Sequence, residues 1–219
     1  MARLALAASQ DRAASTDAMP HITLNTELPG ISGLFRYRPQ TAAPMEELAE
    51  VLLRGPNTLT RGERELIAAY VSSLNECRFC SSSHAAFAAA QLPGGMTQVR
   101  RAFGGVGTGI AVGVGVAAAD DVGAGEADGA EGAPVPAKLR ALLDIAGAVQ
   151  KGGRDVTTEL VDAARAAGAS DVEIHDSVLI AAAFCMMNRY VDGLATFAPD
   201  DPDVYAVTAK RIVEHGYRG

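Results

Sequence analysis

Large aromatic side chains are scarce in this chain of 219 residues, which has no tryptophan and only 5% aromatic residues in total. A core with so few rings must be filled by Ala, Leu, Val, Ile and Met, which suit close contact between helices better than a sandwich of β-branched strands. No stretch alternates convincingly between polar and apolar residues with period two. The composition therefore predicts an all-α protein.

The chain also lacks a long apolar run and an excess of positive charge. Its mean hydropathy of +0.11 arises from Ala and Gly, and no window offers the roughly 20 strongly apolar residues that a bilayer span requires. With 26 acidic against 19 basic residues, the formal net charge is -7, which disfavours a surface that follows phosphates. We expect a soluble protein with neither a membrane nor a nucleic acid as partner.

The N-terminus lacks the pattern of an export signal. Its apolar patch after Arg3 is shorter than the roughly 7 to 15 residues of a secretory core, and Asp11 follows soon after. We interpret residues 1–43 as a leader and an extended arm with a turn at Pro29-Gly30. The expected location is the cytoplasm.

Disulfide scaffolds are excluded, because the chain has only three cysteines, at uneven spacing: Cys77, Cys80 and Cys185. In a reducing compartment, a close pair such as Cys77 and Cys80 indicates catalysis or metal binding. Cys185 stands among apolar residues, where a free cysteine usually behaves as a small buried side chain.

Helical periodicity organises residues 44–198 into a single domain, followed by a tail or short helix at 199–219. Capping-box spacings at Thr60/Glu63 and Ser170/Glu173 predict the starts of two helices. The helices that we expect cover 44–54, 61–74, 77–91, 136–151, 158–167 and 171–197.

Two further expectations concern particular segments. The segment 104–135 consists largely of Gly, Ala, Val and acidic residues, so we predict a flexible insertion there, with a weak helix at 108–119 as the alternative. In the last helix, a set of apolar residues at helical intervals is expected to face the core: Val172, Leu179, Ala183, Met186, Tyr190 and Leu194.

The segment from Glu65 to Phe87 contains the residues that could perform chemistry. On a helix, Cys77, Cys80, His84 and Phe87 fall within roughly 80° of one another, so both thiols and the imidazole share one stripe. Free N–H groups in the first turn of that helix favour a thiolate, and Arg78 adds positive charge nearby. A thiolate in that setting attacks a peroxide or a disulfide, and a neighbouring thiol captures the resulting sulfenic acid.

A carboxylate is expected beside the imidazole. If the chain reverses at Asn75, which tolerates the left-handed conformation, Glu65 lies about 15 Å back along one helix and His84 about 12 Å along the next. The two side chains then stand side by side. Glu65 can accept a hydrogen bond from one His84 nitrogen while the other nitrogen faces Cys80, directly or through a water, which makes a proton relay.

This arrangement resembles a known family. Glu65, eleven intervening residues, the Cys77-Arg78-Phe79-Cys80 motif, three more residues and His84 form the active-site pattern of the carboxymuconolactone decarboxylase and alkyl hydroperoxidase D superfamily. The surrounding sequence, over residues 40–93 and 136–198, is similar to the peroxidase-related branch of this superfamily. The resemblance implies an AhpD-like helical bundle, a homo-oligomer (dimer, trimer or hexamer), and peroxidase activity through Cys77 and Cys80 with Glu65 and His84 as the relay.

The chain departs from the family pattern at two places. Some members have a second His immediately before the second cysteine, where this chain has Phe79, so turnover could be slower or the reductant different. The insertion at 104–135 is longer than the family leads us to expect.

We therefore interpret the chain as a cysteine-dependent peroxidase that converts small organic hydroperoxides to alcohols, with a thiol or a protein disulfide reductant as the electron donor. Cys80 attacks because His84 lies one turn away, and Cys77 resolves; the opposite order is nearly as well supported, since Cys77 lies closer to the helix start. The alternatives are a lactone decarboxylase and a non-enzymatic redox adaptor or assembly module.

No cofactor is expected. The chain has no Gly-rich turn between a strand and a helix, so flavin and nicotinamide sites are not indicated, and no haem signature is present. A structural zinc site would need a fourth ligand beyond Cys77, Cys80 and His84, and no second CxxC offers one.

The remaining candidate residues have structural interpretations. Met186 and Met187 are expected in the core, and Asn188 and Arg189 in helix packing or an interface. Three histidines have no partner pattern and are expected at the surface or at helix ends: His21, His175 and His215.

Overall fold

The computed structural model describes residues 19–104 and 134–218. Within these ranges the chain forms nine α-helices and one 3₁₀ turn, and no strand, which confirms the all-α prediction. The leader before residue 19 and residues 105–133 of the predicted insertion, with its alternative helix at 108–119, lie outside the described residues. The helices are α1 (Gly30–Tyr37), α2 (Pro39–Arg54), α3 (Arg61–Leu74), α4 (Arg78–Ala89), α5 (Gly95–Gly104), α6 (Ala137–Lys151), α7 (Thr158–Ala166), α8 (Asp171–Gly193) and α9 (Pro202–His215).

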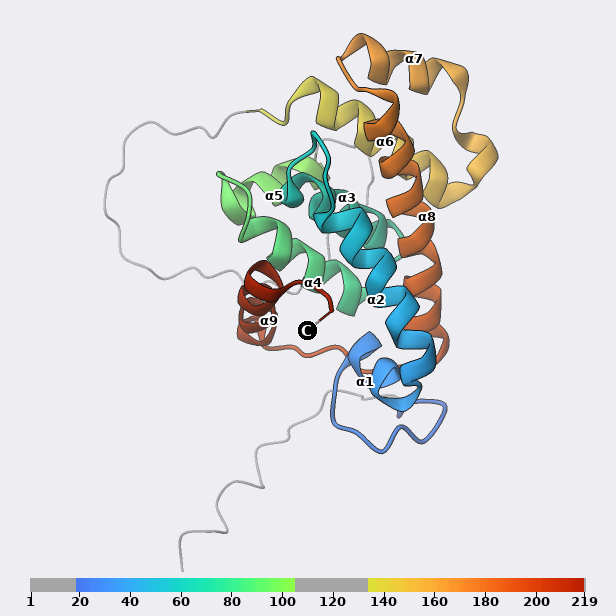
Figure 1. Cartoon of the computed structure of the whole chain (residues 1–219), viewed down its shortest axis with the longest axis vertical. Coiled ribbons are helices and arrows are strands. Elements are labelled where there is room, and N and C mark those ends of the chain that lie inside the picture. The colour runs from blue at the N-terminus through green and yellow to red at the C-terminus, as the bar shows by residue number, and fades with distance from the viewer. Residues whose placement is uncertain (1–18, 105–133, 219) are drawn as a thin grey trace, which may run out of the picture.

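Helix α3 is the centre of the bundle and packs against α4, α6 and α8. Helix α4 also contacts α5 and α9, so it lies between α3 and the C-terminal helix α9 (Figure 1). The main core is aliphatic, as the composition predicts, and its fully buried members include Leu66, Ile67, Leu142, Leu143 and Ile180. Burial of such side chains contributes roughly 1.5–3 kcal/mol each.

Both predicted capping boxes are present. The Thr60 side chain accepts a hydrogen bond from Glu63 N, and the Glu63 carboxylate accepts one from Thr60 N; Ser170 and Glu173 repeat the arrangement at the start of α8. Each box satisfies two backbone donors that the first helical turn would otherwise leave free. Helices α3 and α8 thus begin where the sequence predicts.

The chain reverses between α3 and α4 as expected, but the left-handed residue is Glu76, with φ 58°, and not Asn75. The Asn75 side chain instead forms tertiary hydrogen bonds. Its Nδ2 donates to Asn188 Oδ1 at 2.8 Å, and its Oδ1 accepts from Gln150 Nε2 at 3.0 Å. The fully buried Asn188 also donates to Ser72 Oγ at 3.0 Å. These bonds fix the turn against α6 and α8, and they support the packing role predicted for Asn188.

The N-terminal arm is helical from residue 30 onward, in contrast to the extended chain predicted there, whereas residues 19–29 form no helix. Helix α1 covers 30–37, and α2 begins at Pro39, so Pro44 lies inside a helix instead of near its first turn. The Pro29-Gly30 dipeptide was interpreted as a turn, yet Pro29 is the N-cap of α1. Pro39, in the first turn of α2, removes an N–H that has no helical partner there.

Three apolar residues of α8 that the sequence predicts in the core are exposed to solvent, so this part of the prediction is wrong. Val172, Leu179 and Met186 are 58%, 37% and 47% exposed. Each lies two residues before a buried position of the same helix, and two residues correspond to about 200° of rotation, which is the opposite side. Those buried positions are Ile174, Ala181 and Asn188.

Other boundaries differ less. Helix α8 ends at Gly193 instead of near residue 197, and α5 is not among the predicted helices. Of the two alternatives for 199–219, a tail or a short helix, the structure has a helix, α9, with 14 residues. Among the described helices none is long and apolar enough to span a bilayer.

Candidate active site

The two cysteines stand at the start of α4. Cys77 is the N-cap residue, in an extended conformation, and its N–H donates to Ser72 O at 3.0 Å across the reversal. Cys80 lies in the first helical turn. Both thiols are free, and the two residues are 0% and 4% exposed, so solvent barely reaches them in this conformation.

The surroundings of Cys77 favour its protonated form. A hydrogen bond to Cys80 and burial raise the pKa of the Cys77 thiol well above its usual value. Burial also raises the pKa of the neighbouring Asp192, and a hydrogen bond with Cys77 partly offsets this. A thiol that keeps its proton can donate a hydrogen bond to the Cys80 sulfur.

Glu65 and His84 meet across the α3–α4 contact. His84 Nδ1 lies 2.6 Å from Glu65 Oε2, and Glu65 is 1% exposed. Because an ionised carboxylate only accepts hydrogen bonds, Nδ1 is the donor in this contact, and Nε2 is the ring nitrogen that does not bond to Glu65. The distance arithmetic therefore gave the correct juxtaposition.

Aromatic rings hold the imidazole in place. Phe184 of α8 and Phe87 of α4 contact the His84 ring edge-on, with centroid distances of 4.5 and 5.0 Å. The hydrogen bonds among the described residues do not include a direct one from His84 to either thiol. Proton transfer between His84 and Cys80 then requires a water or a small movement of the ring.

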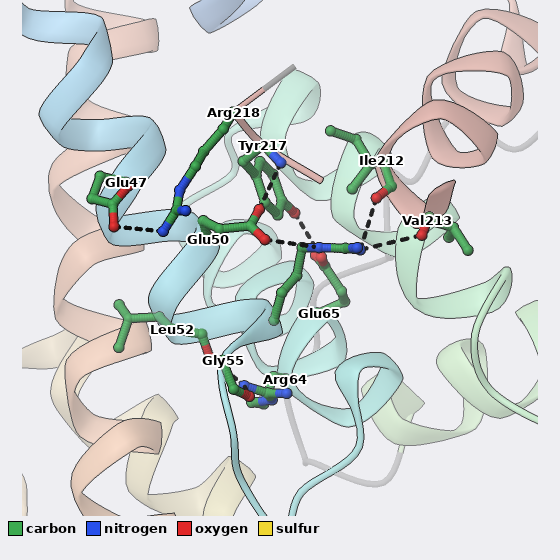
Figure 2. A network of polar contacts seen from close by, with 11 residues as sticks. Glu47, Glu50, Leu52, Gly55, Arg64, Glu65, Ile212, Val213, Tyr217 and Arg218 are labelled. Carbon is green, nitrogen blue, oxygen red and sulfur yellow. Dashed lines mark hydrogen bonds and ion pairs between the residues drawn. The ribbon is translucent and has the colours of Figure 1, made fainter. Parts of the chain in front are cut away.

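One residue at this site was not foreseen from the sequence. The Tyr217 hydroxyl donates to Glu65 Oε1 at 2.6 Å (Figure 2). With His84 at Oε2, the buried carboxylate receives hydrogen bonds at both oxygens. Burial and the neighbouring Glu65 raise the pKa of Tyr217 well above its ordinary value, so the phenol remains a donor. A polar C-terminal stretch with one tyrosine was the only signal in the sequence.

Phe79 occupies the position of the missing second histidine and has a packing role. Its ring fills the space that a side chain at Gly30 would occupy. It also contacts the Tyr205 ring, with 6.2 Å between the ring centroids. Gly30 has φ +52° and donates its N–H to Phe197 O at 3.0 Å. Phe79 thus joins α1 and α9 over the start of α4.

The wall around the cysteine pair is apolar. Cys77 and Cys80 belong to a small cluster separate from the main core, formed by the N-terminal arm, α1 and the end of α8. Its other members are Leu24, Leu34 and Val191, with Ile22, Ile31, Phe79, Tyr190 and Leu194 partly buried against them. An apolar molecule would replace water more readily here than a strongly hydrated one.

Arg78 does not supply free positive charge to the cysteines as expected. Its guanidinium pairs with the Asp200 carboxylate, and both side chains are substantially exposed. Surface pairs of this kind contribute little stability. This pair links α4 to the segment before α9.

The structural interpretations of the remaining residues can be compared with their positions. Cys185 is partly buried against the main core and accepts a weak hydrogen bond from Asn75 Nδ2 at 3.5 Å. Met187 is buried, whereas Met186 is exposed. Arg189 is exposed and bonds its own helix at Cys185 O.

The three histidines outside the site are exposed. His21 contacts Gly193 O at the end of α8, His175 contacts Asp176, and His215 lies in the last turn of α9. Within 19–104 and 134–218, no three His, Cys, Asp or Glu side chains converge as a metal ion would require.

Comparisons with known proteins agree with the resemblance. Residues 39–98, which include Glu65, Cys77, Cys80 and His84, match the model of the carboxymuconolactone decarboxylase family. The structure is similar to that of an uncharacterized peroxidase-related protein from Silicibacter sp. TM1040, with a TM-score of 0.61, 21% identity, and coverage of 81% of this chain and 78% of that chain.

It is also similar to the alkylhydroperoxidase AhpD core of an uncharacterized peroxidase-related protein from Ralstonia eutropha JMP134, with a TM-score of 0.60, 23% identity, and coverage of 84% of this chain and 82% of that chain. No curated protein matches the sequence. At these identities the two structures show a shared fold. The chain is thus similar to the carboxymuconolactone decarboxylase family over residues 39–98, and it shares the fold of these two structures.

Proposed function

We propose that this protein is a thiol-dependent peroxidase that reduces small organic hydroperoxides to alcohols, with Cys80 and Cys77 as the redox pair. The observation that carries the proposal is the position of this pair in the first turn of α4, one turn from an imidazole that is hydrogen-bonded to the buried Glu65. The apolar wall around the thiols supports an organic peroxide over a strongly hydrated one.

The reaction begins when His84 Nε2 takes the proton of the Cys80 thiol. The thiolate attacks the outer peroxide oxygen, the O–O bond breaks, and the alkoxide takes the proton back from His84 to leave as an alcohol. Sulfur is oxidised to sulfenic acid and the peroxide is reduced. Glu65 keeps Nδ1 protonated throughout and stabilises the transient imidazolium.

The Cys77 thiol then attacks the sulfenic sulfur. An S–S bond forms, and the hydroxyl group leaves as water with the Cys77 proton. An external dithiol, either a small molecule or a protein, restores both thiols by two exchange steps and becomes the disulfide. The raised pKa of Cys77 fits a residue that waits as a thiol until sulfenic acid has formed.

The test is consumption of an organic hydroperoxide, with small and protein dithiols as reductants, by wild type and three Cys→Ser variants. Cys80→Ser should abolish turnover, and Cys77→Ser should stop after one equivalent with sulfenic acid on Cys80. Cys185→Ser is the matched control, because this thiol lies on α8 outside the cysteine cluster, and it should behave as wild type.

Two results would count against the proposal. A Cys80→Ser variant that forms sulfenic acid on Cys77 at an undiminished rate would reverse the order of attack. Reduced wild type that consumes no peroxide, with thiols that alkylate like ordinary exposed ones, would favour a redox adaptor or an assembly module instead.

Lactone decarboxylation is the second candidate function. It is favoured by the family whose model matches residues 39–98 and by the acid and base groups Glu65 and His84, which do not need two thiols for that reaction. Release of CO₂ from a muconolactone by the Cys77→Ser/Cys80→Ser double variant would support it.

A further inference from the structure

The segment after α9 returns to the relay, which we define as Cys80, His84 and Glu65. Helix α9 ends at His215, and Gly216, with φ +81°, turns the chain toward α2. A Cβ on Gly216 would lie 2.5 Å from Glu50 Oε2 and 3.0 Å from Arg54 Nε. Glycine is therefore the residue that allows the chain to pass between these side chains.

Helix α2 holds this returning segment at several points (Figure 2). Glu50 Oε2 accepts the Tyr217 N–H at 2.8 Å, and Arg54 donates to the Ile212 and Val213 carbonyls at the end of α9, at 2.8 and 3.4 Å. Glu50 and Arg54 also pair with each other at 3.2 Å. The backbone of Tyr217 is thus fixed before its side chain makes any contact.

The Tyr217 side chain points from this clamp into the relay. Its hydroxyl donates to Glu65 Oε1 at 2.6 Å, and its ring lies nearly parallel to that of His84, with 6.3 Å between centroids. The Glu50 and Arg54 pair of α2 lies beside Tyr217, and the rings of Phe184 and Phe87 contact His84. Cys77 and Asp192 lie at the thiol end of the relay.

A carboxylate that is 1% exposed can stay ionised only if donors replace the water that it has lost. His84 supplies one donor, but it must exchange protons with Cys80 during the proposed reaction. Tyr217 supplies the other donor and does not take part in that exchange. The phenol therefore keeps Glu65 ionised and oriented while the charge on the imidazole changes.

We propose that Tyr217 is a positioning residue of the relay, acting through Glu65 to hold His84 with Nδ1 protonated and Nε2 available to Cys80. This inference rests on the proposed function, because it assigns Tyr217 to the same site. It adds a residue from the other end of the chain to a set that otherwise lies within α3 and α4.

The experiment compares wild type, Tyr217→Phe and Arg218→Ala. Tyr217→Phe keeps the ring and removes one donor; Arg218→Ala loosens the same segment at its surface pair with Glu47 but leaves the phenol in place. Two readouts are followed from pH 4 to 9 on reduced protein: the ¹⁵N shifts of the His84 ring and the alkylation rate of Cys80. Neither needs peroxide.

In wild type the ¹⁵N shifts should show the Nδ1–H tautomer on the alkaline side of the profile. In Tyr217→Phe the ionised carboxylate is less stable, so we expect the acidic limb of both profiles to move to higher pH by about one unit. Arg218→Ala should match wild type. Gly216→Ala, which displaces Tyr217 through its Cβ, should shift the profiles in the same direction as Tyr217→Phe.

Profiles of Tyr217→Phe that superimpose on wild type would overturn the inference, even if the melting temperature falls, because that result indicates packing alone. An equal shift in Arg218→Ala would also overturn it. If wild type consumes no peroxide and the His84 profile still moves in Tyr217→Phe, the proposed peroxidase fails while the positioning role stands. If peroxide is consumed and no profile moves, only the positioning role fails.

Discussion

Two parts of this molecule build the candidate site in different ways. The first is the hairpin, which we define as residues 60–91 with α3 and α4 (Figure 1). The second is the cover, which we define as α1 with the arm before it and α9 with the residues after it. The hairpin carries Glu65, Cys77, Cys80 and His84, whereas the cover seals the thiols and supplies Tyr217.

The two parts also differ in how they are held. The hairpin is fixed by a capping box, by the bonds of Asn75 and Asn188, and by aliphatic packing of α3 against α6 and α8. The cover is held by smaller apolar clusters, such as Ala209 and Ile212 of α9 against Phe87, and by specific contacts such as that of Glu50 with the Tyr217 backbone. We expect the hairpin to open only when the whole protein unfolds, and the cover to open locally.

The largest effect is expected from Glu65→Gln in the hairpin. An amide can present its NH₂ group to His84 and stabilises imidazolium less, so we expect turnover to fall by about 10³-fold, roughly 4 kcal/mol. Glu63→Gln is the matched control, because glutamine also serves in a capping box at the same helix start. The measurement is kcat/KM for a hydroperoxide, and equal values for the two variants would remove Glu65 from the reaction.

The hairpin could be predicted because its geometry is local. Glu65 and His84 are 19 residues apart, and two helices with one reversal fix their distance once the helix starts are known. The same logic located both capping boxes. The precise turn residue was missed because both Asn75 and Glu76 are compatible with the bend, and the tertiary bonds of Asn75 decide between them.

The cover could not be predicted because its contacts are distant in sequence. Tyr217 and Glu65 are 152 residues apart, and no periodicity connects them. Helix α1 was missed because Pro and Gly around it indicate an extended arm, and its packing against α2 and α8 outweighs that local preference. The exposed Val172, Leu179 and Met186 show that a seven-residue repeat alone does not identify the buried face.

The second effect concerns Glu173, at the start of α8, and the free energy of unfolding at acid pH. Burial alone would raise the pKa of Glu173, but hydrogen bonds from Lys138, Ser170 and Thr58 outweigh it and lower the pKa from 4.5 to about 2. The ionised form therefore stabilises the fold above pH 4.5, and this contribution is lost as the pH falls toward 2. The full loss is about 3 kcal/mol.

Urea unfolding of wild type and Glu173→Gln at several pH values between 5 and 2 measures this loss. The free energy of unfolding of the variant should be lower at pH 5 and should depend less on pH. Glu27→Gln, at an exposed position of the arm, is the control and should follow wild type. Parallel curves for Glu173→Gln and wild type would contradict the assignment.

The third effect distinguishes the cover from the hairpin directly. A methyl group added at Gly30 would overlap the Phe79 ring, and the φ of Gly30, +52°, disfavours any residue other than glycine. Gly30→Ala should therefore destabilise the packing of α1 by about 2 kcal/mol. Loosened α1 exposes Cys77 and Cys80, so their alkylation by a bulky reagent should accelerate. Gly193→Ala, which meets no atom within 4 Å, is the control. Unchanged alkylation in Gly30→Ala would mean that α1 does not limit access.

The smallest effect separates local from global opening through two helix caps. Thr60 caps α3 in the hairpin, and Asp201 caps α9 in the cover by accepting the Asp203 N–H at 2.9 Å. Removal of either cap costs about 1 kcal/mol. If the cover opens by itself, Asp201→Ala should increase hydrogen exchange in α9 by about 5-fold and leave α3 unchanged, whereas Thr60→Ala should increase exchange of the slowest amides throughout the protein. Equal increases in α3 and α9 for both variants would show that hairpin and cover unfold as one unit, and the distinction between them would then concern sequence distance and not stability.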